Sequence, residues 1–369
     1  MSFFRPMRIL LLTMLTAMVI GGVHLWNYVE DMTEPVLVPI NRSYAGYSTI
    51  PQKVLGLKLE QFSFTGWDGG EMLAVIAEKD GEESSRQLTI TGDLTVNKVE
   101  RLGVIDYALI CVDWDHGIRS ALPLAESLTA AGITCVLWEP RGTDNRRPYC
   151  THGLKESADV PLLINELTRR SGKESPVIVG VGQGYGAGLM LQAAAGEPRL
   201  AGVISIDAYA SLRESITRTM PESPFTLATL SLMDLRINSS VGFECFDVAP
   251  VESAAKLDRN VPVLIVNLAQ DNPITNINDA VTIYRQLPSD RRDLWTMHTH
   301  KDAPDATTRS ILPARATERT LPVVASLHKD EDSAVIAMVH WLNDTFATSL
   351  DTPHVHVPAR PLLTSDCQL

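Results

Sequence analysis

The sequence predicts an α/β fold with a mostly parallel central sheet, and two observations support this class. Short apolar runs bounded by turn residues alternate with longer stretches of helical period through most of the chain. This alternation is typical of parallel strands joined by crossover helices. The chain has 369 residues and 45% hydrophobic content, which is enough to bury one large core. We therefore expect one domain over residues 55–346, with helices on both faces of the sheet.

The expected elements follow one another in a regular order. Residues 57–64 and 72–77 alternate as two strands around Trp67-Asp-Gly-Gly70, which predicts an antiparallel hairpin. Further strands are expected at 107–112, 134–138, 177–180, 202–206, 262–266 and 294–297, and helices at 121–131, 160–170, 187–195, 277–287 and 333–346. The insertion at about 211–255 predicts a small cap, and the tail 347–369 is expected to be loose.

The N-terminal segment 1–26 is expected to meet a membrane. Arg5 and Arg8 precede an apolar run from Ile9 to Trp26, whose 18 residues are about the minimum for a spanning helix. The positive charge before this run predicts a cytoplasmic N-terminus and a globular domain on the non-cytoplasmic side. No convincing cleavage site follows, which favours an uncleaved anchor; the alternative is a cleaved signal peptide and a secreted protein. Residues 27–54 show no helical period and are expected to form an irregular connector.

Composition excludes some classes of function. The net charge of −12 and the lack of a basic stripe argue against nucleic-acid binding. We expect no cofactor, and no structural zinc site because C-x-x-C is absent; His298-x-His300 lacks a nearby acid cluster that would make it a metal site. Cys111 and Cys135 lie in strand-like runs and are expected to be buried, whereas Cys150 and Cys245 could pair in an oxidising compartment.

The most informative motif is the run Gly180-Val-Gly-Gln-Gly-Tyr-Gly-Ala-Gly188, between an apolar run and a helix-like stretch. In the G-x-S-x-G nucleophile elbow, a serine stands on a sharp turn between strand and helix, and small residues flank it at two positions before and after. Here Gly182 and Gly186 hold the flanking positions, while Gly184 stands in the nucleophile slot. The turn is predicted to be kept and the nucleophile to be missing.

The same glycines allow a second interpretation. The run from Gly182 to Ala187 also fits the looser G-x-G-x-x-A dinucleotide fingerprint, and Asp207 lies near the position of a ribose-binding acid. Such a fingerprint normally occupies the first turn from strand to helix, whereas two such turns precede it here. Dinucleotide binding therefore remains an alternative, as does a tight turn without a ligand.

Several further motifs occur in the order found in a known family. They are Phe64-Thr-Gly-Trp-Asp-Gly-Gly70 with its D-G turn, Asp115-His-Gly117, Arg141-Gly142, the segment 149–160, Ile206-Asp-Ala-Tyr-Ala-Ser-Leu212, and the strand and acid at 262–271. On these motifs the chain resembles the α/β-hydrolase superfamily, in particular its membrane-anchored bacterial branch of serine hydrolases. The resemblance covers about residues 55–346 and implies an α/β-hydrolase fold of esterase-like or lipase-like ancestry. It does not identify a substrate; the Met, Leu and Phe residues of the cap are compatible with a small apolar or ester ligand and equally with packing.

The resemblance also implies the positions of a catalytic triad. Asp271 follows the strand at 262–266 and is the expected acid, which would orient the histidine and stabilise its charged form. His300 is the expected base, and His328, which precedes the last helix, is the alternative.

The resemblance further places an oxyanion hole beside Gly184. His116 and Gly117 match the oxyanion loop, and the backbone N–H groups of Ile118 and Tyr185 would form the hole itself.

Glycine at position 184 decides the expected function, because acyl transfer by a triad needs a hydroxyl or thiol at that point. We expect a degenerate ester hydrolase, inactive or very weak, that serves at the membrane as a binding or scaffold protein with unknown protein partners. The alternative is an active esterase or lipase-like enzyme with an unrecognised nucleophile; Ser205 and Ser211 are near in sequence but are better explained by packing and capping.

Overall fold

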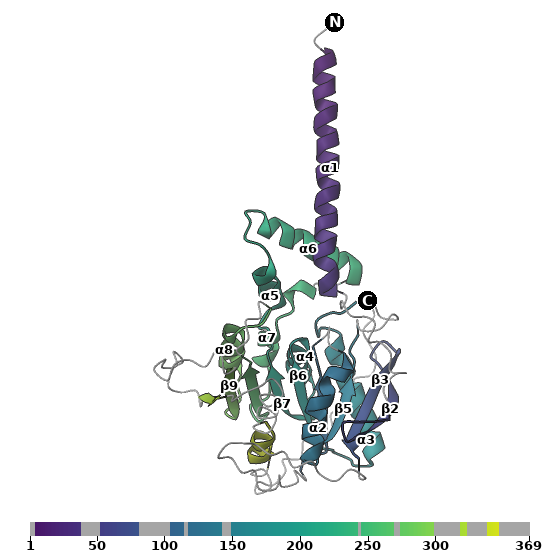
Figure 1. Cartoon of the computed structure of the whole chain (residues 1–369), viewed down its shortest axis with the longest axis vertical. Helices are drawn as coiled ribbons and strands as arrows, with labels where there is room; N and C mark the ends of the chain where they lie inside the picture. The colour runs from purple at the N-terminus through teal and green to yellow at the C-terminus, as the bar shows by residue number, and fades with distance from the viewer. Residues whose placement is uncertain are drawn as a thin grey trace.

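The computed structural model describes residues 4–37, 52–80, 104–113, 117–141, 149–242, 245–268, 274–298, 318–322 and 338–346. Within these ranges, ten strands form one sheet in the order β1-β2-β3-β5-β4-β6-β7-β8-β9-β10 (Figure 1). The strands are β1 Lys53–Val54, β2 Leu57–Thr65, β3 Glu71–Lys79, β4 Tyr107–Cys111, β5 Thr134–Trp138, β6 Ile178–Gln183, β7 Leu200–Ile206, β8 Val263–Asn267, β9 Arg292–His298 and β10 Glu318–Pro322.

The sheet is mostly parallel, as the sequence predicts. Strands β1, β2, β3 and β5 pair antiparallel along one edge, while every pairing from β5 through β4 to β10 is parallel. The predicted hairpin is present as β2 and β3, which pair over their whole length from Leu57 to Lys79. Strand β10 was not predicted from the pattern of the sequence.

Helices cover both faces of the sheet, and the strands alternate their side chains accordingly. In β4, Ala108 and Ile110 pack on one face, together with α2 Leu122–Ala130 and the helix at 338–346. Leu109 and Cys111 pack on the other face, together with α3 Val160–Ser171, α4 Tyr185–Gly196 and α8 Ile277–Gln286. The layered α/β arrangement is therefore confirmed.

The carboxyl ends of the central parallel strands meet at one edge. Cys111 of β4 pairs with Gly182 of β6, and Gln183 of β6 pairs with Ile206 of β7. The residues that follow these strands therefore start beside one another. The elbow glycine, an acid after β4 and an acid after β7 are neighbours for this reason.

A buried arginine joins three of the segments that carry the sequence motifs. The guanidinium group of Arg141 donates to both carboxylate oxygens of Asp159, at 2.8 Å each, and also binds Asp68 in the hairpin turn. Asp159 is fully buried and accepts a further hydrogen bond from the backbone N–H of Trp67 at 2.9 Å. Because a buried carboxylate needs several donors, this pair fixes the hairpin against the start of α3.

The N-terminal helix differs from the expectation. Helix α1 runs from Phe4 to Leu37, so residues 27–37 are helical and not part of an irregular connector. Val29, Thr33 and Leu37 recur every four residues and are buried. This stripe was overlooked because the acids Glu30, Asp31 and Glu34 separate its members in the sequence.

The described part of the insertion at 211–255 is helical. It contains α5 Leu212–Thr219, α6 Thr226–Val241, a short turn of helix Cys245–Asp247, and α7 Pro250–Ala254. Figure 1 shows α6 lying across the lower end of α1. Leu230, Met233 and Ile237 of α6 share a buried cluster with Val29 and Leu37 of α1, so the cap and the N-terminal helix pack as one unit.

The body of the protein also holds the C-terminal end of α1. The last carbonyl groups of a helix lack partners within it. The carbonyl of Leu37 accepts from the backbone N–H of Cys150 at 2.9 Å, and that of Val36 accepts from the His152 ring at 2.8 Å. Among the described residues, α1 is the one helix long and apolar enough to cross a membrane, and it could be an anchor or a signal sequence.

The packing of α1 on the cap predicts the effect of shortening the side chain of Val29. Val29→Ala removes two buried methyl groups and should lower the free energy of unfolding by about 1.5–3 kcal/mol. The exposed Glu34 lies on the same stretch, and Glu34→Ala should change stability by less than about 0.5 kcal/mol. Chemical denaturation of the full chain in detergent measures both. Equal losses for the two variants would show that α1 does not pack on α6.

Candidate active site

Gly184 stands at the sharp turn that the sequence predicts. It follows β6, immediately precedes α4, and has φ 54° and ψ −118°. A side chain at such a positive φ costs of order 1–3 kcal/mol. The turn is held by a hydrogen bond of 2.8 Å from the Gly184 N–H to the carbonyl of Ile206. The geometry of a nucleophile elbow is thus present without a nucleophile.

The two flanking glycines are required by close contact between backbones. A Cβ at Gly182 would overlap the carbonyl of Gly186 in the first turn of α4. A Cβ at Gly186 would overlap the carbonyl of Cys111 at the end of β4. Both positions therefore need glycine for the strand and the helix to approach, as the motif implies.

A carboxylate occupies the position that the Cβ of a nucleophilic residue at 184 would take. A Cβ built on Gly184 would overlap the carboxyl group of Asp113, which follows β4. One oxygen of this group, Oδ1, accepts a hydrogen bond of 3.0 Å from the backbone N–H of Tyr185. The carboxylate lies at the N-terminus of α4, where negative charge is favoured by the free N–H groups and the helix dipole.

The second expected oxyanion donor is also bound to a carboxylate. The backbone N–H of Ile118 donates to Oε1 of Glu139 at 3.1 Å. Glu139 follows β5, and its side chain is buried. Gly117, at φ 64°, precedes this N–H and turns the chain into the helical turn Ile118–Ala121. The N–H groups of both Ile118 and Tyr185 therefore donate to acids of the chain itself.

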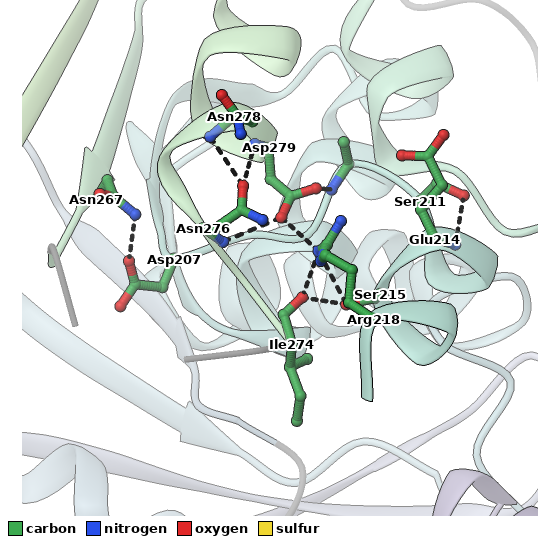
Figure 2. A network of polar contacts seen from close by, with 11 residues as sticks. Asp207, Ser211, Glu214, Ser215, Arg218, Asn267, Ile274, Asn276, Asn278 and Asp279 are labelled. Carbon is green, nitrogen blue, oxygen red and sulfur yellow. Dashed lines mark hydrogen bonds and ion pairs between the residues drawn. The ribbon is translucent and has the colours of Figure 1, made fainter. Parts of the chain in front are cut away.

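A second acid lies at the same edge. Asp207 follows β7 and has a positive φ of 51°. Its Oδ1 accepts from the N–H of Leu268 at 2.8 Å. It also accepts from the side-chain amide of Asn267 at 3.3 Å, the contact drawn in Figure 2. Burial, with a smaller contribution from the negative charge of Asp113, raises the pKa of Asp207 to about 6.

The cap is tied to this edge by a network that Figure 2 also shows. Arg218 of α5 pairs with Asp279 of α8 at 2.6 Å and donates to the carbonyl of Ile274 at 2.8 Å. Asp279 also accepts from the N–H of Ala210 at 3.1 Å, and it completes a capping box with Asn276. The start of α8 and the base of the cap are therefore fixed to each other beside β7.

The predicted triad lies outside the described part of the site. Asp271, His300, its alternative His328, and His116 of the oxyanion loop all lie outside the described residues. The described part of the site consists of Gly184 with its flanking glycines, the N–H groups of Ile118 and Tyr185, and the acids Asp113, Glu139 and Asp207.

One buried histidine was not predicted as part of the site. The Nε2–H group of His152 donates to the Val36 carbonyl. Nδ1 of the neutral ring is therefore an acceptor, and it accepts a hydrogen bond from the Tyr209 hydroxyl at 3.3 Å. Burial lowers the pKa of His152 to about 4, which keeps the ring neutral. Its ring lies edge-on to that of Tyr185, with 5.8 Å between centroids. His152 therefore connects the end of α1 to the residue after Gly184.

Neither serine near the elbow is placed as a nucleophile. Ser205 is fully buried within β7. Ser211 is the N-cap of α5, where its hydroxyl accepts from the N–H of Glu214. Ser205 therefore packs within the sheet and Ser211 caps a helix, as the sequence favours.

The cysteines are partly as expected. Cys111 and Cys135 are buried, and burial raises the pKa of both thiols well above the usual range. Cys150 is buried, its Sγ accepts from the N–H of His152 at 3.3 Å, and it is not in the suggested disulfide with Cys245.

The geometry of the turn argues against a bound dinucleotide. A pyrophosphate would need the free N–H groups at the start of α4. The Asp113 carboxylate is bound there instead and would repel it. Asp207, the expected ribose ligand, accepts hydrogen bonds from Leu268 and Asn267. Within the described ranges, no group of three or more His, Cys, Asp or Glu side chains is placed to hold a metal ion.

Comparison with solved structures shows the α/β-hydrolase fold. An esterase of Pyrococcus furiosus matches with a TM-score of 0.53 and 11% identity, over 80% of this chain and 96% of that chain. A 2,6-dihydroxy-pseudo-oxynicotine hydrolase matches with a TM-score of 0.51 and 13% identity, over 79% and 69%. An acylaminoacyl peptidase of Pyrococcus horikoshii matches with a TM-score of 0.50 and 12% identity, over 80% and 43%. No protein-family model and no curated protein matches the sequence.

The raised pKa of Asp207 predicts a pH dependence of stability. From about pH 4 to pH 6 the folded state retains a proton that the unfolded state has lost, so Asp207 lowers stability as pH rises through this window. A shift of two units corresponds to about 3 kcal/mol above pH 6. Asp207→Asn tolerates the positive φ and removes this charge. The free energy of unfolding of this variant, relative to that of the natural protein, should rise between pH 4 and pH 6 and remain constant above pH 6.

Urea unfolding at a series of pH values measures this difference. The surface variant Asp290→Asn is the control and should follow the natural protein. A constant difference between Asp207→Asn and the natural protein over the window would show that Asp207 is ionised throughout.

Proposed function

We propose that the protein is a membrane-anchored member of the α/β-hydrolase fold whose catalytic site is degenerate and occupied by its own carboxylates, and that it acts by binding. The observation that carries the proposal is the position of Asp113. Its carboxylate fills the space of a nucleophile and accepts the N–H of Tyr185.

The electrostatics of the site oppose ester hydrolysis. An oxyanion hole accelerates acyl transfer because its N–H groups donate to the negative oxygen that forms in the transition state. Here one N–H donates to Asp113 and the other to Glu139. A tetrahedral oxyanion would have to displace both carboxylates or approach them with the same sign of charge. Among the described residues, the elbow therefore carries no hydroxyl or thiol, and both expected oxyanion donors are already bound to carboxylates.

The N-terminal helix supports anchoring over secretion. Helix α1 is continuous from Phe4 to Leu37, so residues 27–37, which directly follow the apolar run, are helical and offer no extended segment for cleavage. The last two turns of α1 pack on the cap, which fixes the domain close to the membrane. Arg5 and Arg8 at the start of the helix favour a non-cytoplasmic domain.

The ligand would be small and apolar or an ester, and it would approach between the cap and the carboxyl edge of the sheet. This follows from the contacts of the cap helices: Arg218 of α5 pairs with Asp279 of α8, and the N–H of Val251 in α7 donates to the carbonyl of Ala210, which follows β7. A groove of about 730 Å³ lies elsewhere, between β2 and α3, and includes no residue of the elbow.

A second candidate function is hydrolysis with Asp113 as the nucleophile. The specific observation in its favour is that Oδ2 of Asp113 lies in the nucleophile slot. Carboxylates attack electrophilic carbon in some hydrolases and form ester intermediates. Mass spectrometry of the full chain after reaction with an alkyl epoxide distinguishes the two functions, because a covalent adduct on Asp113 supports the enzyme and its absence supports binding.

Labelling by a fluorophosphonate probe tests the degenerate site directly. The natural protein in detergent should not react, because Gly184 has no side chain. Gly184→Ser alone should label weakly, since its Cβ must displace the Asp113 carboxylate. Asp113→Ala with Gly184→Ser should label at least about tenfold more strongly, because it frees both the slot and the Tyr185 N–H; one such donor contributes about 10²–10³ in rate.

The matched control is Asp113→Ala with Gly184→Ala, which carries the same Cβ without a hydroxyl and should not label. Its unfolding curve also reports the strain of a side chain at position 184. Strong labelling of the natural protein would overturn the proposal. Equal labelling of Gly184→Ser with and without Asp113→Ala would also overturn it.

A further inference from the structure

The cap presents an apolar surface that the protein itself does not cover. Phe225, just before α6, is 72% exposed, and Leu227 in its first turn is 79% exposed. Leu235 lies two turns later and is 62% exposed. Leu227, Ser231 and Leu235 are spaced by four residues, so they form one stripe of the helix. We call Phe225, Leu227 and Leu235 the cap stripe.

The opposite side of α6 explains why the cap stripe is exposed. Leu230, Met233 and Ile237 are buried against α1 and the rest of the cap. They take up the face that packs on the protein, which leaves the cap stripe directed away from that cluster. Its exposure follows from the docking of α6 and is not caused by fraying at a terminus.

The docking of α6 on α1 places this surface at the level of a membrane interface. Arg236 of α6 pairs with Glu30 of α1 at 3.1 Å. Glu30 lies four residues beyond Trp26, where the apolar run ends, and this corresponds to about 6 Å along the helix axis. The polar headgroup layer of a bilayer extends about 5–8 Å beyond the hydrocarbon core. In Figure 1 the connection between α5 and α6 reaches further along α1 than the rest of the cap.

We propose that the cap stripe inserts into the lipid interface of the leaflet from which α1 emerges. The inference rests on the proposed anchoring role of α1. Phe and Leu side chains on the outer face of an interfacial helix bury apolar area among headgroups and the first acyl carbons. The cap would thus lie on the bilayer, and the edge of the sheet that carries Gly184 would face the membrane surface.

Charge identifies the kind of lipid contact. Residues 219–235 contain no Lys or Arg, and they contain the acids Glu222 and Asp234. An interaction with anionic headgroups would need basic residues. Insertion therefore depends on apolar contact and should occur in vesicles of phosphatidylcholine alone. A large basic patch that would point instead to nucleic acid is absent from this segment.

Site-directed spin labelling of the full chain in phosphatidylcholine vesicles tests the proposal. Cys245 and Cys367 are replaced by serine, and the buried Cys111, Cys135 and Cys150 are retained. A nitroxide is placed at Leu227→Cys on the cap stripe. The matched control is Glu174→Cys, which is exposed before β6 at the opposite edge of the sheet. A third label at Val19→Cys reports whether α1 is in the bilayer.

Collision with oxygen, which concentrates in lipid, is compared with collision with a water-soluble nickel chelate. The label at 227 should show a ratio of oxygen to nickel collision several-fold above that at 174, and close to that of a label in lipid. If the label at position 19 is in lipid but the collision ratio at position 227 equals that at position 174, α1 is anchored and the proposed insertion of the cap is wrong. If 227 is shielded from both reagents, protein covers the stripe and the proposal is overturned. If 19 itself is in water, the anchor and this inference both fail.

Discussion

The hydrogen bond between the Asp113 carboxylate and the first N–H of α4 is the interaction on which the account of the site depends. The contact strains neither partner, because a carboxylate stabilises a helix N-terminus and Gly184 leaves room for the Asp113 side chain. A side chain at 184 would remove that room. The observed position of the Asp113 carboxylate is therefore compatible only with glycine at position 184. This carboxylate occupies the space of a nucleophile and the N–H of an oxyanion donor.

This site is connected by side-chain contacts to α1, the helix proposed as the membrane anchor. The end of α1 is held by His152 and Cys150, and the ring of His152 lies against Tyr185, whose N–H binds Asp113. On the other side of the cap, Arg218 and Asp279 join α5 to α8. A displacement of α1 relative to the body would therefore act on the cap and on the elbow at once.

Much of the fold could be predicted from the sequence, because the apolar runs are distinct and the glycines at 182, 184 and 186 require a tight turn whatever the chemistry. The extension of α1 could not, since its buried stripe is interrupted by acids and is recognised only with α6 beside it. Asp113 and Glu139 were missed although each closely follows a predicted strand at the functional edge. An acid there is expected to bind a ligand, and only the three-dimensional contact shows that it binds the backbone. The spatial positions of Asp271, His300, His328 and His116 remain predictions.

The central claim is that the site is filled by the protein's own carboxylates. The most direct test is a crystal structure of the full chain soaked with an alkylphosphonate, whose tetrahedral anion resembles the intermediate of ester hydrolysis. The account predicts that Asp113 remains bound to the N–H of Tyr185, at about the 3.0 Å found here, with no phosphonate at the start of α4. A phosphonate oxygen bound by the N–H groups of Ile118 and Tyr185, with Asp113 and Glu139 turned away, would contradict it.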